Sequence, residues 1–374
     1  MATIQRNPPF RAEHLGSLLR PPELIRAREG WQRGDVSREE LSSLERRYVV
    51  EAVRLQERIG LQVISDGEFP RWSWRDLLFD TADGFSAQRE ESDLKFRDAT
   101  GKPFSGRPVP SVVGRLRRRE SMTVDSFRHV SALTSRTVKV TFPSPSVTHI
   151  FRGDRMLADS PYRGDRKAYF ADVAAIYREE IAELASAGCC YIQVDDPPMI
   201  LLADEGVRRV IRERGEDPDE LARQYVDMFN DAVGKRPVGV TLGVHLCRGN
   251  SEQGIGSAGY DAIAEIVFAG MNADTFFLEY DTARSGGFEP LKHVPKDRTV
   301  VLGLISTKVP ALESMDDLRR RVDEAARYVD MNRLCLSPQC GFASNYNQQR
   351  FSIADQERKL AHVVQAAQEI WKDA

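Results

Sequence analysis

Short apolar runs alternate with longer amphipathic segments along most of this 374-residue chain, and this alternation restricts the possible fold more than any other feature. The short runs are rich in β-branched and aromatic residues, and each ends in a polar or glycine-containing cluster, as buried strands do. Several of the longer segments begin at Ser or Asp and end at Gly, which are helix caps. The eight short runs read FRAEHLGS, LQVISDGE, TVKVTFPSPS, CYIQVDD, VGVTLGVHLC, TFFLEYD, TVVLGLIS and RLCLSPQCG.

Eight strands that alternate with helices predict a closed (β/α)8 barrel, or TIM barrel, formed by residues 1–374 as one catalytic domain. The polar stretch at about 81–122 is too long for a simple strand-to-helix connection, and its VVGRLRRRE pattern indicates an inserted hairpin after the second strand. An open, doubly wound sheet would show a similar alternation. That alternative is disfavoured because HLGSLLRP, after the first run, lacks the GxGxxG spacing of a phosphate-binding loop.

Composition excludes several classes of partner. The formal net charge is -3 and both signs are mixed along the chain, so no basic surface for nucleic acid or an anionic membrane is expected. The N-terminus, MATIQRNPPFRAEH, has no apolar segment, and no window approaches the roughly 18 apolar residues of a membrane helix. Five cysteines without a CxxC pair predict free or metal-bound thiols. We therefore expect a cytoplasmic protein that acts on small molecules.

The residues that close the eight runs are expected to meet at one face, because the active site of a (β/α)8 barrel forms where its strands end. These residues are polar and include carboxylates, imidazoles, hydroxyls and thiols. They are His14, Ser17, Asp66, Glu68, Ser144, Ser146, Asp195, Asp196, His245, Cys247, Glu279, Asp281, Ser306, Lys308 and Cys340. The sequence thus predicts a polar active site at this end of the barrel.

Four of these residues match the ligand types that zinc prefers. His245 and Cys247 are two positions apart, so an imidazole and a thiol leave the same face of a strand. Glu279 and Cys340 close two further runs and add a carboxylate and a second thiol. We therefore predict Zn²⁺ as a cofactor, bound by His245, Cys247, Glu279 and Cys340.

Each ligand also has an ordinary structural explanation. Cys340 precedes Gly341 and fits a small buried residue at a tight turn, and Glu279 could pair with Arg284 on the same loop. A shared metal explains the four residues together better than these separate explanations do. The remaining cysteines are assigned to packing; they are Cys189, Cys190 and Cys335.

At these positions the sequence resembles the cobalamin-independent methionine synthases, specifically short relatives that correspond to the C-terminal catalytic half of that enzyme. The motifs run from near residue 14 to residue 344 and read HLGSLLRP, ISDGEFPR, FPSPS, IQVDDPP, VHLCRGN, FLEYDTARSG and SPQCGF. The resemblance implies a (β/α)8 barrel whose four-ligand zinc binds the sulfur of homocysteine. It also implies that groups matching Ser17, Glu68 and Asp195 hold the amino acid end, and we add His14 as a substrate-binding candidate.

Zinc suits this reaction because a free thiol, with a pKa of about 8.5, is mostly protonated at neutral pH, whereas a metal-bound thiol loses its proton. Glu68 and Asp195 could accept hydrogen bonds from a substrate ammonium group. Salt bridges are the alternative explanation of these two carboxylates. The candidate partners are Arg20, Arg71 and Arg248.

The chain departs from the family after the seventh strand, where an aspartate-isoleucine-histidine stretch is replaced by GLISTKVP, without a histidine. In the family that histidine looks like the acid that helps to activate the folate donor. Lys308 or His14 could replace it, and we list Lys308 with Asp195 as catalytic candidates. The methyl donor is therefore left open between methyl-folate and a methylcobalamin species, for example one carried by a corrinoid protein.

Three functions follow from these residues. The first is a zinc-dependent methyltransferase that makes methionine from homocysteine. The second is an epoxyalkane:coenzyme M transferase or another zinc-dependent thiol alkyltransferase, whose sulfonate thiol would need cationic groups where homocysteine needs carboxylates. The third is a non-catalytic zinc-binding barrel, although structural zinc sites are usually closed and often built on CxxC pairs. Glu68 and Asp195 favour the first function.

Overall fold

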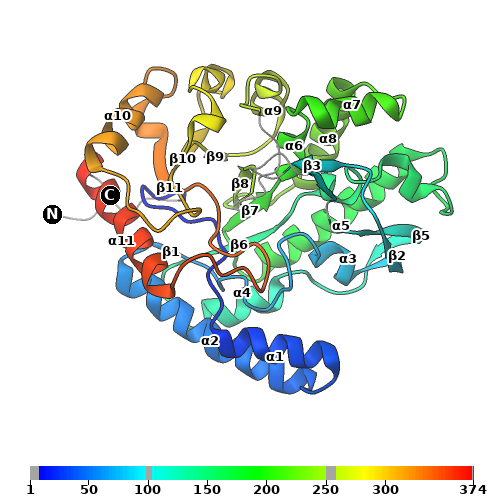
Figure 1. The fold of residues 1–374 in the computed structure, drawn as a ribbon, viewed down its shortest axis with the longest axis horizontal. Helices are drawn as coiled ribbons and strands as arrows, with labels where there is room; N and C mark the ends of the chain where they lie inside the picture. Colours follow the sequence, from blue (N-terminus) through cyan, green and yellow to red (C-terminus); the bar gives the residue numbers. More distant parts are fainter. Residues whose placement is uncertain (1–7, 98–102, 106, 250–257, 373) are drawn as a thin grey trace.

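The computed structural model of the chain describes residues 8–97, 103–105, 107–249, 258–372 and 374. A curled sheet of seven parallel strands surrounds the centre of the molecule, and helices cover its outside (Figure 1). The strands follow one another in the sheet in chain order, which confirms the predicted TIM-barrel class. In this order they are β1 (Val63–Ile64), β6 (Thr137–Pro143), β7 (Tyr191–Asp195), β8 (Thr241–Leu246), β9 (Thr275–Glu279), β10 (Thr299–Ile305) and β11 (Leu334–Pro338).

The predicted first strand, FRAEHLGS, differs from the other seven. Its pairing with β11 consists of one isolated bridge between Ala12 and Leu336, supported by a bond from the Glu13 amide to the Leu336 carbonyl at 2.8 Å. Gly16 adopts a φ of 104°, which extended backbone does not allow, so the chain bends before a longer ladder can form. The N-terminal segment nevertheless lies in the eighth strand position, since the Leu18 amide donates to the Gly67 carbonyl after β1 at 3.0 Å.

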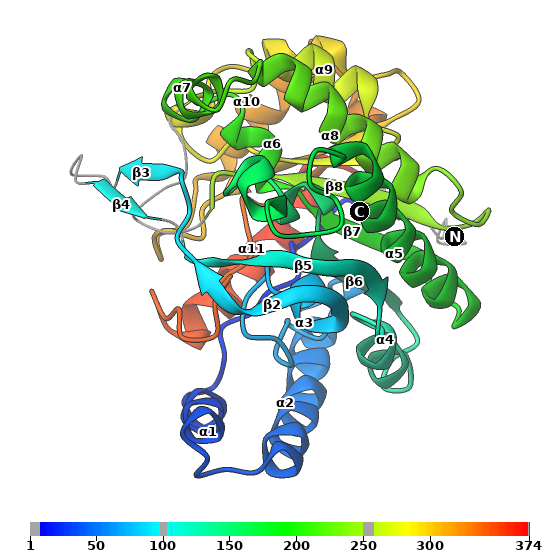
Figure 2. The same ribbon diagram turned by 90° about the vertical axis from the view of Figure 1, so that its right-hand side faces the viewer.

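Helices connect the strands, and their ends carry the expected caps. In α2, Ser37 and Glu40 form a reciprocal capping box, and α1 and α2 extend together beyond the barrel (Figures 1 and 2). None of the described helices is long and apolar enough to cross a membrane. The α-helices are α1 (Pro22–Arg33), α2 (Arg38–Ile59), α3 (Leu77–Thr81), α4 (Val124–Ser131), α5 (Arg166–Ser186), α6 (Pro197–Leu201), α7 (Glu205–Glu213), α8 (Pro218–Val233), α9 (Ala264–Gly270), α10 (Met315–Ala325) and α11 (Ile353–Ile370).

The insertion expected at about 81–122 contains two antiparallel ribbons (Figure 2). The longer one pairs β2 (Ala82–Glu90) with β5 (Val109–Arg118), and the shorter one pairs β3 (Lys95–Arg97) with β4 (Pro103–Ser105). Arg118 belongs to the VVGRLRRRE pattern and donates to Glu180 at 2.7 Å and to Glu183 at 2.6 Å, both on α5. These ion pairs fasten the hairpin to the outside of the barrel.

A small apolar cluster fills the inside of the sheet, separate from the main core between sheet and helices. Beside it, the Lys139 amine donates to Glu13 Oε2 at 2.9 Å, and both side chains are 0% exposed. The Lys139 amine also donates to the His14 carbonyl, and the Tyr191 hydroxyl donates to Glu13 Oε1 at 2.9 Å. These bonds attach the N-terminal segment to β6 and β7 inside the barrel.

A glycine-rich motif occurs later in the chain. Residues 254–259, GIGSAG, have the GxGxxG spacing that is missing after the first run. They follow β8, in the second half of the sheet, and not the first strand of a dinucleotide-binding unit. Residues 250–257 lie outside the described part of the chain.

Candidate active site

A pocket of about 100 Å³ lies at the carboxyl ends of the strands, where a barrel of this class carries its active site. Segments that follow β1, β7, β8 and β11 meet there with the N-terminal segment. The lining includes six predicted site residues: Ser17, Glu68, Asp195, His245, Cys247 and Cys340. It also includes residues that the sequence did not single out: Leu15, Trp74, Pro197, Gly249, Gly341, Ser344, Asn345 and Gln348.

Three of the four predicted metal ligands form a compact cluster. The ligand atoms of His245, Cys247 and Cys340 all lie within 4.8 Å of one another, and all three residues are buried. The two sulfur atoms are 3.6 Å apart. His245 lies near the end of β8 and Cys247 directly follows it, so the two-residue spacing brings both side chains into the pocket. One imidazole and two thiols at this spacing are a donor set suited to zinc.

The imidazole of His245 is oriented by a carboxylate. Its Nδ1 lies 3.0 Å from Asp195 Oδ1, because the parallel register of β7 and β8 pairs these two residues. Its Nε2 is buried and, among the described residues, has no hydrogen-bond partner. A buried polar atom without a partner is costly, and a carboxylate that holds the other ring nitrogen is typical of metal-binding histidines. The geometry therefore fits a metal ion next to Nε2.

The charges in the cluster favour a thiolate. A hydrogen bond from Cys340 lowers the pKa of Cys247 to about 5 in spite of burial, and the nearby His245 adds to this effect. Burial opposes protonation of His245, but Cys247 and Asp195 raise its pKa to about 10. The same sulfur contact raises the pKa of Cys340 well above its usual value. The direction of these shifts favours the thiolate form of Cys247, which is the form of cysteine that binds metals.

Glu279, the fourth predicted ligand, contacts cations instead of the His-Cys-Cys cluster. Its Oε2 accepts from the Arg248 amide at 2.6 Å, and its Oε1 accepts from Arg284 at 2.8 Å and from Lys308 at 3.0 Å. Burial alone would raise the pKa of Glu279, but Lys308, Arg248 and Arg284 lower it. The pairing with Arg284 considered from the sequence is therefore present. A fully buried carboxylate requires such partners to remain ionised.

Lys308 belongs to this neighbouring ion-pair group. Besides Glu279, its amine contacts both carboxylate oxygens of Asp281 at 3.0 Å. Among the described residues that line the pocket, neither Lys308 nor Glu279 occurs. Both residues therefore belong to an ion-pair group beside the cluster, close enough for the charge of Glu279 to raise the pKa of Cys247 and of Cys340.

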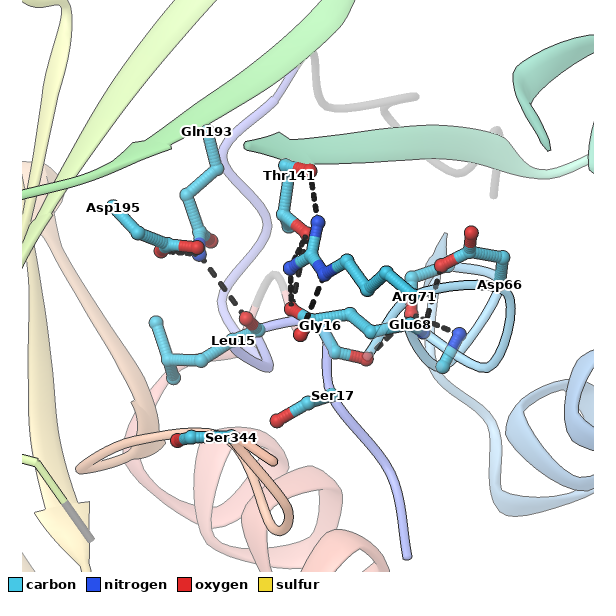
Figure 3. Close-up of polar contacts among 12 residues, drawn as sticks. Leu15, Gly16, Ser17, Asp66, Glu68, Arg71, Thr141, Gln193, Asp195 and Ser344 are labelled. Carbon is cyan, nitrogen blue, oxygen red and sulfur yellow. Dashed lines mark hydrogen bonds and ion pairs between the residues drawn. The ribbon is translucent and has the colours of Figure 1, made fainter. Parts of the chain in front are cut away.

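Asp195 links the pocket to the barrel wall (Figure 3). Its Oδ1 accepts a hydrogen bond from Gln193 Nε2 at 2.8 Å as well as the contact from His245. Gln193 Nε2 also donates to the Leu15 carbonyl at 3.1 Å. Both bonds to Asp195 fall on Oδ1, so Oδ2 is the oxygen available to a ligand in the pocket. Gln193 lies two residues before Asp195 on the same face of β7, and this spacing was a signal that sequence reasoning overlooked.

Glu68 is held by a second buried group on the other side of the pocket (Figure 3). Arg71 Nη2 lies 2.5 Å from Glu68 Oε1, and the Thr141 hydroxyl donates to the same oxygen at 3.0 Å. Burial raises the pKa of Glu68, Arg71 lowers it, and nearby Asp195 raises it further. The salt bridge to Arg71 considered from the sequence is thus present, and it keeps the carboxylate in place at the pocket wall.

Ser17 is packed against the segment that carries Cys340. Its carbonyl accepts from the Phe342 amide at 2.9 Å, and its Oγ accepts from the Ala343 amide at 3.3 Å. A side chain at Gly341 would place its Cβ 1.9 Å from Ser17 Oγ. The close approach of the two segments therefore requires glycine at position 341.

His14 points away from the pocket. Its Nε2 lies 3.2 Å from the Val63 carbonyl, and its Nδ1 accepts from the Gly16 amide at 3.2 Å. Burial and the Lys139 charge lower the pKa of His14 to about 3, so the ring is neutral at physiological pH. His14 is therefore not placed with Leu15 and Ser17, which do line the pocket.

The remaining cysteines fit the packing assignment in two cases. Cys189 is buried, and Cys335 belongs to the apolar cluster inside the sheet. Cys190 is exposed, so its assignment to packing is wrong. It follows Cys189 directly at the amino end of β7, and adjacent residues in extended chain point to opposite sides.

Comparisons with known proteins show the family to which this chain is similar. The family model described as the catalytic domain of the cobalamin-independent synthase matches residues 11–369. The uncharacterized proteins YxjH and YxjG of Bacillus subtilis strain 168 are 38% and 37% identical, over 98% of this chain and 96% of each relative. The 5-methyltetrahydropteroyltriglutamate–homocysteine methyltransferase of Mycobacterium leprae is 24% identical over 97% of this chain, which spans 43% of that longer protein.

Two solved structures are similar over nearly their whole length. A candidate vitamin-B12 independent methionine synthase from Listeria monocytogenes has a TM-score of 0.73 and 28% identity, covering 97% of this chain and 98% of its own. A B12-independent methionine synthase from Shewanella sp. W3-18-1, in complex with selenomethionine, has a TM-score of 0.71 and 20% identity with the same coverage. The second likeness supports the fold alone.

We expect Gly341→Ala to destabilise the protein, because the added methyl group would push Ser17 away from the segment after β11. Overpacking of this kind costs roughly 1–3 kcal/mol of unfolding free energy, which urea denaturation would measure. Gly287→Ala is the control, since a Cβ there meets nothing within 4 Å. Equal stability of the two variants would contradict the close packing described for Ser17.

Proposed function

Because this chain belongs to the family of cobalamin-independent synthase catalytic domains, we propose that it is a zinc-dependent methyltransferase that converts homocysteine to methionine. The family is one of methyltransferases, which supports the reaction class. The observation that carries the proposal is a single pocket in which the His-Cys-Cys cluster lies together with Glu68 and Asp195. The cluster suits a thiol sulfur, and the carboxylates suit an ammonium group on the same small molecule.

His245, Cys247 and Cys340 would hold the zinc ion. Three protein ligands are usual in a catalytic zinc site, where a further position is left for a substrate. When bound, zinc would lower the pKa of the substrate thiol, so that a thiolate is present at neutral pH. Asp195 supports this arrangement because it fixes the ring of His245 through Nδ1. Glu279 as a fourth ligand stays a prediction.

The charges of the lining support an amino thiol over a sulfonate thiol. Among the described residues that line the pocket there are two carboxylates and no Arg or Lys. Arg71 neutralises Glu68, so Asp195 Oδ2 is the stronger acceptor for an ammonium group. A sulfonate would meet Asp195 without a compensating cation, which is unfavourable in a buried site. This argues against coenzyme M as the thiol.

The apolar part of the lining has a separate role. Leu15, Trp74 and Pro197 contribute surfaces that exclude water from a bound thiol. Removal of water strengthens the hydrogen bonds that Asp195 and Ser17 offer to the substrate. These residues would therefore hold the homocysteine sulfur and amino group in a fixed orientation toward an incoming methyl group.

The first test of the proposal is zinc content. We expect about one zinc ion per chain in the wild-type protein, and a loss of most of it in Cys247→Ser and Cys340→Ser, because a neutral hydroxyl is a poor substitute for a thiolate. Cys335→Ser is the control, since Cys335 lies inside the barrel. Metal analysis after dialysis would measure this, and full retention of zinc in both ligand variants would refute the proposed site.

The second test concerns the amino group of the thiol. Asp195→Asn should weaken homocysteine binding by roughly ten- to a hundredfold, because it removes one charge-assisted hydrogen bond. Asp196→Asn is a matched control, since this neighbouring carboxylate bonds Ser146 and the Met199 amide instead. Titration calorimetry of zinc-loaded protein would measure both. Normal homocysteine affinity in Asp195→Asn together with tighter binding of a sulfonate thiol would favour the thiol alkyltransferase function.

The third test concerns the methyl donor, and we expect poor use of methyl-tetrahydrofolate. A methyl group leaves the folate nitrogen readily only when an acid protonates that nitrogen, and such help is worth roughly 10²–10⁴-fold in rate. Lys308 is held by two carboxylates and His14 is buried and neutral, so neither is placed to act as that acid. Methylcobalamin, as an external donor, requires no such proton.

Steady-state assays with zinc, homocysteine and each donor at equal concentration would decide this point. Efficient methionine formation from methyl-tetrahydrofolate alone would show that another group supplies the proton.

A further inference from the structure

The pocket lies where the two ends of the sheet, β1 and β11, face each other, and we call this junction the seam. The strand ladder runs from β1 to β11, and in the described part of the chain β11 and β1 are not paired with each other. Three irregular segments fill this seam at the mouth of the barrel: 15–20, 66–71 and 340–346. Each contributes residues to the pocket lining, namely Ser17, Glu68 and Cys340. The distances within the pocket therefore depend on what holds these three segments together.

Arg20 lies between the segments and contacts both of the others. Its side chain is almost fully buried, at 1% exposure. Nη1 donates to the carbonyls of Ala343 at 3.0 Å and Asn345 at 3.4 Å. Nη2 donates to the carbonyl of Arg71 at 3.2 Å and to that of Glu68. One end of the guanidinium thus holds the segment after β1, and the other end holds the segment after β11.

The carbonyl of Glu68 belongs to a strained residue. Glu68 has a φ of 61°, in the left-handed region that non-glycine residues rarely adopt. Such a conformation persists only where surrounding interactions enforce it. Arg20 supplies one interaction at the carbonyl, and Asp66 supplies another by accepting from the Glu68 amide at 2.8 Å. The strain directs the Glu68 side chain toward Thr141 and the pocket.

Backbone bonds complete the junction. The Trp74 amide donates to the Ser344 carbonyl at 3.0 Å, and the Tyr346 amide donates to the Trp72 carbonyl at 2.9 Å. These backbone bonds require the chain after β1 and the chain after β11 to stay at the distance that the Arg20 guanidinium spans. A lysine amine in the same place could not serve two pairs of carbonyls at once, because its donors radiate from one nitrogen instead of a planar fork.

We propose that Arg20 is a positioning residue that fixes the distance between Glu68 and the Cys340 segment and thereby sets the affinity for the thiol substrate. The effect of Arg20 on thiol affinity rests on the proposed function, whereas its role in holding the segments at the seam does not. Arg20 does not line the pocket among the described residues, so it acts through the segments that it joins.

The chain offers a matched control in Arg28. Its side chain is also buried, at 3% exposure, and it donates to the Phe69 carbonyl at 2.7 Å in the same 66–71 segment. Its other hydrogen-bond partner among the described residues is Glu45 on α2, so no hydrogen bond in this part of the chain joins Arg28 to the segment after β11 as the bonds of Arg20 do. A substitution at Arg28 therefore removes a buried guanidinium from the same region without opening the seam.

The experiment compares Arg20→Lys and Arg28→Lys in zinc-loaded, full-length protein. In Arg20→Lys we expect amide hydrogen exchange in peptides covering 70–76 and 340–349 to accelerate at least about tenfold, since the buried charged hydrogen bonds that protect them are lost. We expect KM and Kd for homocysteine to rise at least about tenfold, with kcat at saturating thiol within about twofold of wild type. Arg28→Lys should leave exchange and thiol affinity near wild-type values.

Each result decides the proposal. Unchanged exchange in Arg20→Lys, or an equal change in Arg28→Lys, would overturn the role of Arg20 at the seam. If Arg20→Lys fails to fold while Arg28→Lys folds, Arg20 has a purely structural role and the proposed positioning role is wrong. If the wild-type protein binds no homocysteine, the proposed function fails, and the exchange comparison still tests the junction by itself.

Discussion

The barrel depends on how the two ends of its sheet are joined, because β1 contains two residues and the N-terminal segment makes one bridge to β11. Within the described residues, side chains perform much of this closure. Inside the barrel, Lys139 on β6 binds Glu13, and at the mouth Arg20 binds carbonyls on both sides of the seam. Buried charges carry a large desolvation cost, and they are stable here because each has several hydrogen-bond partners. The barrel is therefore closed by buried polar side chains, and this closure is stable only if each buried charge has its hydrogen-bond partners.

The same requirement organises the pocket. Glu68 has Arg71 and Thr141 as partners, and Asp195 has Gln193 and His245. Among these described residues, the bonds leave Asp195 Oδ2 and His245 Nε2 without a protein partner. One is an anionic acceptor, and the other is a nitrogen beside two sulfur atoms. The proposed binding of an amino thiol rests on these atoms more than on the number of polar residues at the barrel mouth.

Much of this arrangement could be predicted from the sequence, because strand periodicity determines which side chains share a face. Seven of the eight runs form the parallel sheet, and the two-residue spacing of His245 and Cys247 brings their side chains together. Of the partners of Glu279, Arg284 was considered from the sequence, whereas Lys308 was not. A carboxylate at a strand end can bind a metal ion or pair with a basic side chain, and Lys308, which follows the next strand, supplies such a side chain. Arg20 was considered as a salt-bridge partner, yet its partners are backbone carbonyls, which no residue pattern reveals.

The strained backbone of Glu68 and the open seam occur together for a physical reason. A strand ladder imposes extended φ and ψ angles on every residue that it pairs, so a residue with a φ of 61° cannot belong to one. Because β1 ends at Ile64, the chain is free to bend four residues later and to turn a carboxylate back into the pocket. The left-handed conformation of a non-glycine residue costs about 1–2 kcal/mol, which the buried bonds of Arg20, Arg71 and Asp66 can offset. A longer, regular strand at this position would make the barrel wall more stable by itself, but it would hold position 68 in an extended conformation and remove the bend that aims Glu68 at the pocket.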